Sequence, residues 1–153
     1  MFGGYIESNN MYPLEDVCSF VDYRGKTPPK VDNGVMLLTA KNVREGYLSF
    51  EPREYMDKEK YEQWMTRGYP KCGDILFTTE APLGNVCRIP QINELFAVGQ
   101  RIITIQPDKK ILNYDYVTYV LQSDYFKAEV DKQATGSTAK GIKGIVSLVM
   151  SDK

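Results

Sequence analysis

Short apolar runs bounded by turn formers constrain the fold of this chain more than any other feature of its sequence. Residues 35–39, 75–78 and 101–105 are too short for stable helices, and their apolar or β-branched composition is typical of buried strands. Other segments of the chain carry the helical period instead. The irregular alternation of the two patterns, without a repeat or a low-complexity linker, predicts a single mixed α+β domain with short twisted β-strands and a few helices.

The predicted helices can be placed by their caps. Asp57 is suited to cap a helix over residues 57–67 that Gly68 ends, and Met56 and Tyr61 are spaced to staple its start. Asn113 is suited to cap a second helix, and Ser123 or Asp124 a third. The expected apolar faces are Tyr61, Trp64 and Met65 in the first helix, Val117, Val120 and Leu121 in the second, and Phe126 and Val130 in the third.

Charge and length limit the classes of partner. The chain has 153 residues, enough for one core, and its 19 Lys and Arg are balanced by 20 Asp and Glu. Any surface for a nucleic acid must therefore be basic only locally. Neither a signal peptide nor an apolar run of about 18 residues occurs, so we expect no membrane partner and a cytoplasmic location.

Absent residues and motifs exclude most enzyme mechanisms. The sequence contains no histidine, no dinucleotide-binding glycine motif and no phosphate-binding P-loop. A small metal-dependent enzyme using Glu80, Asp74 or Asp108 remains as an alternative, although Asp108 lies in a QPDKK segment typical of a turn. Three cysteines lie too far apart for zinc-binding pairs and are expected to be reduced and mostly buried: Cys18, Cys72 and Cys87.

Four polar segments combine turn formers with hydrogen-bond donors, at residues 23–30, 39–46, 78–85 and 134–143. Any one of them could be a solvated connection, but together they favour a surface that binds a polar ligand. Basic and hydroxyl side chains suit phosphate oxygens, whereas Asn, Gln and Arg can pair with base edges. The candidate DNA-binding residues are Arg24, Lys26, Lys41, Asn42, Arg44, Thr78, Thr79, Asn85, Gln100, Arg101, Thr135, Ser137, Thr138, Lys140 and Lys143.

Seven of these candidates are expected to share one face, since the segments flank strands that enter from related ends: Lys41, Asn42, Arg44, Thr79, Gln100, Arg101 and Lys140. Arg101 has an alternative, because it opens a predicted strand and could equally serve as a structural ion-pair partner. The segment ATGSTAKGIK at 134–143 also has two interpretations. Its glycines and lysines suit a close approach to DNA or a docking contact, and its position near the end of the chain suits a flexible tail.

Five segments, taken in order, resemble one known family. They are PLEDVCSFVDYRGKTPP, LLTAKNVREG, GDILFTTEAPLGNV, FAVGQRIITI and ATGSTAKGIK, and they span nearly all of residues 13–143. This order is similar to a target recognition domain of the specificity subunit of type I restriction-modification enzymes. The resemblance implies a DNA-methylase specificity-domain-like fold.

In that family the specificity subunit is not catalytic. The resemblance implies that the chain reads half of a bipartite double-stranded DNA target for DNA methylation and restriction, and so takes part in phage defence. It also implies docking to modification subunits and, through them, to restriction subunits. The chain itself is expected to hold no metal and no cofactor, because S-adenosylmethionine, ATP and Mg²⁺ would belong to the partner subunits.

The ends of the chain differ from the family pattern. The expected organisation is a lead at 1–12, the recognition domain at 13–143, and a truncated spacer helix or a tail at 144–153. A full specificity subunit is similar to two copies of this domain, each followed by a long spacer helix. The chain is thus expected to be a half-length subunit, whether an engineered fragment, a natural truncation or a gene remnant. The alternative function is an interaction domain, or an inert remnant, that competes for modification subunits.

Overall fold

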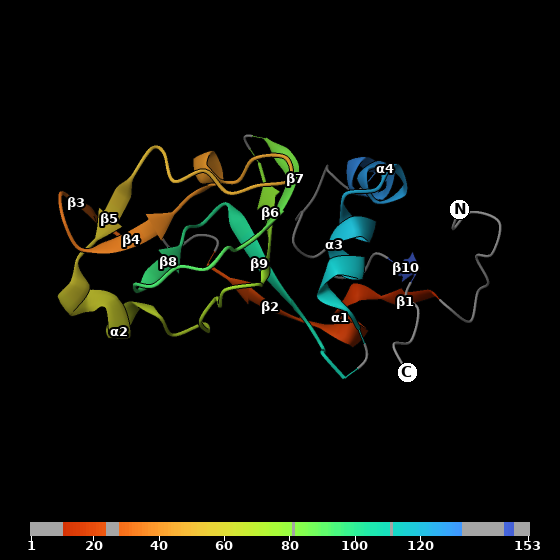
Figure 1. Cartoon of the computed structure of the whole chain (residues 1–153), viewed down its shortest axis with the longest axis horizontal. Coiled ribbons are helices and arrows are strands. Elements are labelled where there is room, and N and C mark those ends of the chain that lie inside the picture. The colour runs from red at the N-terminus through yellow and green to blue at the C-terminus, as the bar shows by residue number, and fades with distance from the viewer. Residues whose placement is uncertain (1–10, 24–27, 81, 111, 133–145, 149–153) are drawn as a thin grey trace. The chain divides into compact units, whose positions relative to one another are not determined.

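The computed structural model of the chain describes residues 11–23, 28–80, 82–110, 112–132 and 146–148 (Figure 1). The chain divides into two compact units, one of residues 20–105 and one of residues 1–19 with 106–153. Both helices and sheets are present, as the sequence predicts. Within the described ranges, no helix has the length and apolar character needed to cross a membrane.

Most strands lie in the unit of residues 20–105 and form two four-stranded sheets. The first sheet has the order β2-β9-β6-β7, with bounds Cys18–Asp22, Ile102–Pro107, Ile75–Thr79 and Leu83–Arg88. The second has the order β3-β5-β4-β8, with bounds Lys30–Val31, Glu54–Met56, Val35–Leu38 and Phe96–Val98. In the second sheet β4 pairs antiparallel with β5 and parallel with β8.

The β3-β5-β4-β8 sheet is packed on both faces, which explains why β4 is apolar at every position. Met36 and Leu38 belong to a core cluster with Leu76, Cys87 and Ile102 of the other sheet. The alternate side chains of β4 belong to a second cluster, which is made of Val21, Tyr23, Val35, Leu37, Met56, Tyr61, Met65 and Ala97. A strand that is buried on both faces has apolar residues at nearly every position, which is why such runs predict strands. The three predicted strands are found as β4, β6 and β9.

The first predicted helix is shorter than expected. Asp57 accepts a hydrogen bond from the Glu59 N–H, at 2.9 Å, and caps the 3₁₀ turn η4 at Lys58–Lys60, which leads into α2 at Tyr61–Trp64. The chain then leaves the helical conformation instead of continuing to residue 67. The reason is tertiary: the Arg67 N–H donates to the Tyr23 hydroxyl, which donates to the Gly68 carbonyl.

The other unit contains the two predicted C-terminal helices, α3 at Tyr114–Leu121 and α4 at Asp124–Lys132. Asn113 caps α3, and Ser123 accepts a hydrogen bond from the Phe126 N–H at the start of α4. All the side chains predicted for their apolar faces are buried. The caps and faces of both helices are therefore confirmed.

The same unit also contains elements that the sequence analysis missed. The helix α1 occupies Leu14–Val17, and β1 at Met11–Pro13 pairs antiparallel with β10 at Val146–Leu148. Residues 146–148 form this strand within the segment 144–153, for which a truncated spacer helix or a tail was predicted. The extended segment satisfies its backbone hydrogen bonds on β1, and the predicted domain bounds stay a prediction.

The cysteines are free, but they differ in burial: Cys87 is buried, Cys18 is intermediate and Cys72 is exposed. The exposure of Cys72 corrects the expectation that the thiols are mostly buried. Burial raises the pKa of the Cys87 thiol to about 12. Burial, and secondarily the charge of Asp108, raise the pKa of the Cys18 thiol to about 12.

Candidate functional site

A groove of about 290 Å³ lies in the unit of residues 20–105, at the end of the β3-β5-β4-β8 sheet. It gathers residues from four separate parts of the chain: the segment before and in β3, the end of β4 with the 3₁₀ turn η3 at Ala40–Asn42, the start of β5, and the turn before β9. Its lining residues are Pro28, Lys30, Leu37, Thr39, Ala40, Lys41, Glu54, Gly99, Gln100 and Arg101.

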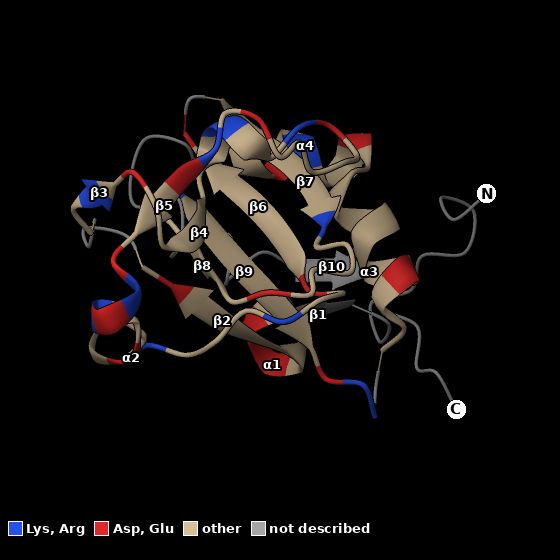
Figure 2. Ribbon diagram, turned by 60° about the vertical axis from the view of Figure 1, so that its left-hand side comes forward, with Lys and Arg blue, Asp and Glu red and all other residues tan. Residues whose placement is uncertain are grey.

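Strand register places a carboxylate inside this groove. Glu54 pairs with Leu37 across β5 and β4, and Lys30 pairs with Met56 across β3 and β5. Because side chains alternate along a strand, Glu54 and Lys30 lie on the same face as diagonal neighbours. Figure 2 shows the Lys and Arg colouring of β3 and the Asp and Glu colouring of the paired strand β5.

Two lysines contact the Glu54 carboxylate at different distances. The Lys30 Nζ lies 2.9 Å from Glu54 Oε1, and the Lys41 Nζ lies 3.7 Å from Oε2. Only 16% of the Glu54 side chain is exposed, against 52% for Lys30 and 67% for Lys41. The carboxylate is therefore held inside the groove while the two ammonium groups reach solvent.

Gln100 and Arg101, from the turn before β9, also line the groove. The Arg101 Nε lies 3.0 Å from Glu80 Oε2, and the Arg101 carbonyl accepts a hydrogen bond from the Thr79 N–H. Half of the Arg101 side chain stays exposed, so both of its predicted roles, ion-pair partner and surface cation, are compatible with this geometry. Arg101 precedes β9 rather than opening it.

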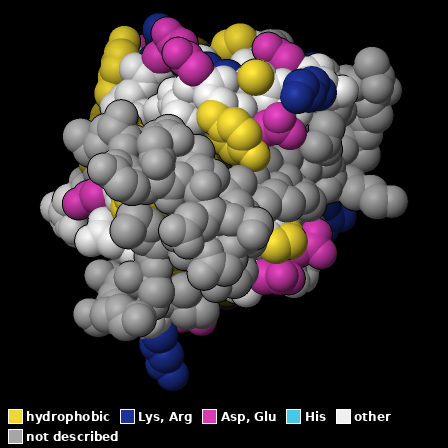
Figure 3. Space-filling view, turned by 90° about the vertical axis from the view of Figure 1, so that its right-hand side faces the viewer, with side chains coloured by type: hydrophobic (Ala, Val, Ile, Leu, Met, Phe, Trp, Pro, Cys, Tyr) yellow, Lys and Arg dark blue, Asp and Glu magenta, His cyan; other side chains and the backbone are white. Residues whose placement is uncertain are grey.

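The lining of the groove is positively charged. It contains the cationic side chains of Lys30, Lys41 and Arg101 and one carboxylate, that of Glu54. A concave surface with an excess of positive charge attracts anions such as phosphate groups. Figure 3 shows a different face of the molecule, where the Lys and Arg side chains of the described residues lie apart from one another.

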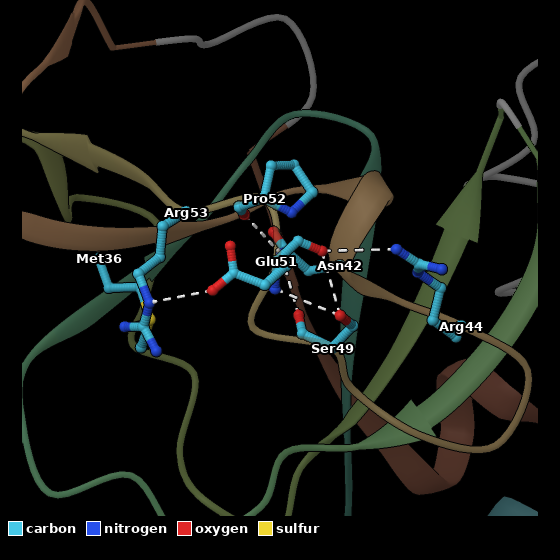
Figure 4. Close-up of polar contacts among 7 residues, drawn as sticks. All are labelled: Met36, Asn42, Arg44, Ser49, Glu51, Pro52 and Arg53. Carbon is cyan, nitrogen blue, oxygen red and sulfur yellow. Dashed lines mark hydrogen bonds and ion pairs between the residues drawn. The ribbon is translucent and has the colours of Figure 1, made fainter.

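Asn42 is a candidate that the structure places in the core. Its side chain is 2% exposed, accepts a hydrogen bond from the Thr39 N–H, and donates to the carbonyls of Ser49 and Pro52 (Figure 4). These bonds hold the segment 49–52 against the η3 turn. Asn42 thus serves the fold, contrary to the expectation that it contacts DNA, because its amide is buried and already bonded.

Thr78 and Asn85 also serve the fold, and Thr79 is buried as well. Thr78 and Thr79 are 0% and 8% exposed as whole residues, so each offers little surface for the DNA contact expected of it. The Thr78 hydroxyl accepts a hydrogen bond from the Asn85 N–H, and the Asn85 side chain donates to the Val43 carbonyl. Asn85 is partly buried by this contact, which joins β7 to the segment after η3.

Arg44 is exposed, as a DNA-binding residue should be, but backbone carbonyls hold its guanidinium. The Nε donates to the Lys41 carbonyl at 2.9 Å, and Nη2 donates to the Glu51 carbonyl at 3.4 Å (Figure 4). Arg44 does not line the groove. The predicted common face is therefore found in part, since Lys41, Gln100 and Arg101 come together.

The remaining candidates lie outside the described residues, and the predictions made for them stay predictions. They are Arg24, Lys26, Thr135, Ser137, Thr138, Lys140 and Lys143. The interpretation of the segment ATGSTAKGIK is likewise unchanged. By contrast, the groove includes two charged residues that were not candidates, Lys30 and Glu54. Lys30 lies in a polar segment noted in the sequence, but only the β3-β5 pairing could have identified Glu54.

The carboxylates of the enzyme alternative are engaged in local contacts. Glu80 pairs with Arg101, Asp74 accepts a hydrogen bond from the Lys71 N–H, and Asp108 accepts one from the Lys110 N–H. The last contact confirms the predicted turn at QPDKK. In the part of the chain that the structure describes, no three His, Cys, Asp or Glu side chains gather as a metal site.

Comparisons with known proteins identify the fold. The chain superposes on the HsdS subunit from Thermoanaerobacter tengcongensis with a TM-score of 0.61 and 18% sequence identity, covering 97% of this chain and 35% of that chain. A second solved structure, reported for complex assembly and conformational transition of the type I R-M system, gives a TM-score of 0.66 at 17% identity. That match covers 97% of this chain and 36% of the other.

The chain thus has the fold found in specificity subunits and spans about a third of the length of the chains it matches. The fold class predicted from the sequence is confirmed. No protein-family model matches the chain, and no curated protein matches it either.

Proposed function

We propose that this chain is a DNA-recognition domain that reads half of a bipartite target as the specificity component of a type I restriction-modification system. The observation that carries the proposal is the basic groove, whose lining contains the cations Lys30, Lys41 and Arg101 and one carboxylate, that of Glu54. The fold shared with an HsdS subunit supports the same function. The near-neutral net charge is compatible with it, because the positive charge is concentrated locally.

Within this proposal the groove binds DNA through two kinds of contact. Lys41 and Arg101, both well exposed at the rim, neutralise phosphate oxygens. Gln100 lines the groove and carries the amide donor and acceptor needed for a base edge. Phosphate contacts fix the register of the domain on the duplex, and base contacts supply the sequence preference.

Catalysis is proposed to belong to partner subunits. The modification subunits would bind S-adenosylmethionine, and the restriction subunits would use ATP and Mg²⁺, while this chain would act in the cytoplasm in phage defence. We accordingly expect the chain alone to show no nuclease and no methyltransferase activity. Turnover that is lost in Glu80→Gln or Asp108→Asn would contradict this.

Co-purification with modification subunits tests the proposed partner directly. Competition for the modification subunits without DNA binding would favour the interaction-domain alternative.

The DNA-binding proposal is tested by the salt dependence of binding. A fluorescent duplex is titrated with the chain from about 50 mM to about 200 mM salt, the range over which phosphate contacts lose most of their affinity. Lys41→Ala is expected to weaken binding to all sequences and to reduce the log–log salt slope by about 1, as for one lost phosphate contact.

Lys58→Ala is the matched control, because Lys58 is an exposed lysine of η4 that does not line the groove. It should leave both affinity and slope unchanged. Wild-type protein that fails to bind DNA at low salt would overturn the proposal. Equal effects of the two substitutions would remove the groove from the DNA-binding surface.

A further inference from the structure

We infer that Glu54 determines part of the DNA sequence preference, by accepting a hydrogen bond from the exocyclic amino group of a base, that is, cytosine N4 or adenine N6. This inference rests on the proposed function and deepens it. The sequence did not mark Glu54, which enters the groove only through the pairing of β5 with β3 and β4.

The position of the carboxylate is fixed before any ligand binds. Glu54 lies in a central strand of its sheet, opposite the fully buried Leu37, and its side chain is 16% exposed. The Lys30 Nζ at 2.9 Å holds one carboxylate oxygen from the neighbouring strand. A rigid acceptor on a strand loses little side-chain entropy on binding, which is what a base-reading group needs.

The second carboxylate oxygen retains the capacity to accept a hydrogen bond. The Lys41 Nζ lies 3.7 Å from Oε2, which is longer than a hydrogen bond. Lys41 is also the more exposed of the two lysines, so it can turn toward a phosphate while Lys30 stays on the carboxylate. A carboxylate has about four lone-pair positions, and the contact with Lys30 leaves positions for a donor from a ligand.

The chemistry of the groove selects an amino donor over other groups. A carboxylate repels phosphate oxygens and the carbonyl oxygens of guanine and thymine, but it accepts hydrogen bonds from the amino groups that cytosine and adenine present in the major groove. The apolar side chains of Pro28, Leu37 and Ala40 line the same groove and lower the local dielectric constant. Phosphates are then confined to the cationic rim and a base edge to the interior.

A purely structural role for Glu54 makes a different prediction. If the carboxylate only joined β3 to β5 through Lys30, its removal would change stability and leave sequence preference intact. The half-exposed lysine limits the value of such an ion pair to about 0–1 kcal/mol. The two roles are therefore separated by measuring base preference and stability on the same variants.

The experiment is selection of bound duplexes from a randomised DNA library by the full chain, followed by sequencing. Wild type is expected to enrich a DNA sequence with a preference for cytosine or adenine at one position, and Glu54→Gln is expected to change the base preference at that position. Glutamine replaces one acceptor by a donor, so the preference at that position should fall by about tenfold and the other positions should keep theirs. Glu54→Asp keeps the negative charge but places it on a shorter side chain. It should weaken the base preference at the same position and at no other.

Glu51→Gln is the matched control. Glu51 lies three residues before Glu54, its side chain is 80% exposed, and it contacts Arg53 outside the groove. The DNA sequence preference of the Glu51→Gln variant should equal that of wild type. Thermal unfolding of each variant identifies any variant that fails to fold. If one Glu54 variant does not fold, the base preference of the other Glu54 variant tests the inference.

Two negative outcomes have different meanings. If wild type enriches a sequence and both Glu54 variants enrich the same one with unchanged preference at every position, the inference is wrong and the proposed function stands. If wild type binds but enriches no sequence at all, or does not bind, the proposed recognition function fails and the inference fails with it.

Discussion

At the scale of the residue, neighbouring polar side chains take opposite roles in this protein. Lys41 is exposed at the rim of the groove, whereas Asn42 beside it is buried and bonded to the backbone. Both belong to the 3₁₀ turn η3, where consecutive side chains point in different directions. Composition marks such a segment as polar, but burial decides which side chain can meet a ligand.

The role assigned to Asn42 predicts a loss of stability. Asn42→Ala leaves the carbonyls of Ser49 and Pro52 without their side-chain donor inside the protein. We expect the free energy of unfolding to fall by about 2–3 kcal/mol in denaturant titrations. Asn93→Ala, at an exposed asparagine that contacts the Gln91 side chain, should change it by less than about 0.5 kcal/mol. An Asn42 variant of normal stability but impaired DNA binding would return this residue to the binding surface.

At the scale of the element, local signals fixed the starts of helices more reliably than their ends. Asp57, Asn113 and Ser123 all accept the hydrogen bonds expected of capping residues. The end of α2 is set instead by Tyr23, which is distant in sequence and binds the backbone at Arg67 and Gly68. A cap acts within one turn, so it can be recognised from the sequence, whereas a tertiary contact cannot.

The cap of α3 makes a quantitative prediction. Asn113 accepts a hydrogen bond from the Tyr116 N–H at 3.1 Å, and Asn113→Ala removes the acceptor. We expect a loss of about 1 kcal/mol in the free energy of unfolding, measured by denaturant titration. Asn113→Ser keeps a capping oxygen and should retain most of that stability. No loss in Asn113→Ala would show that the cap contributes nothing, and equal losses for the two substitutions would show that the capping oxygen is not the cause of the loss.

At the scale of the whole molecule, the thiols report on global packing. Cys87 is 0% exposed in the cluster between the two sheets, and its thiol pKa is raised to about 12 by burial. The thiolate is the reactive species, so a raised pKa keeps Cys87 unreactive at pH 8 in the folded protein. Unfolding restores an ordinary thiol pKa of about 8.5 and with it the reactivity.

We therefore expect a colorimetric thiol reagent at pH 8 to modify the exposed Cys72 rapidly, and Cys87 only as the protein unfolds. Cys18, whose pKa is raised in the same direction, should also react slowly. Cys72→Ser is the control and should abolish the rapid phase. Reaction of Cys87 at the rate of Cys72 in the native protein would show that the core between the sheets opens readily.

The sequence by itself determined the mixed fold class, the strands β4, β6 and β9, and the caps of three helical segments, because these depend on apolar runs and side chains that act over a few residues. It also brought Lys41, Gln100 and Arg101 into consideration. Only the tertiary structure decided that Asn42 and Thr78 are buried and that Glu54 lies between Lys30 and Lys41. Those outcomes depend on strand register, and register is set by pairing between segments that are distant in the chain.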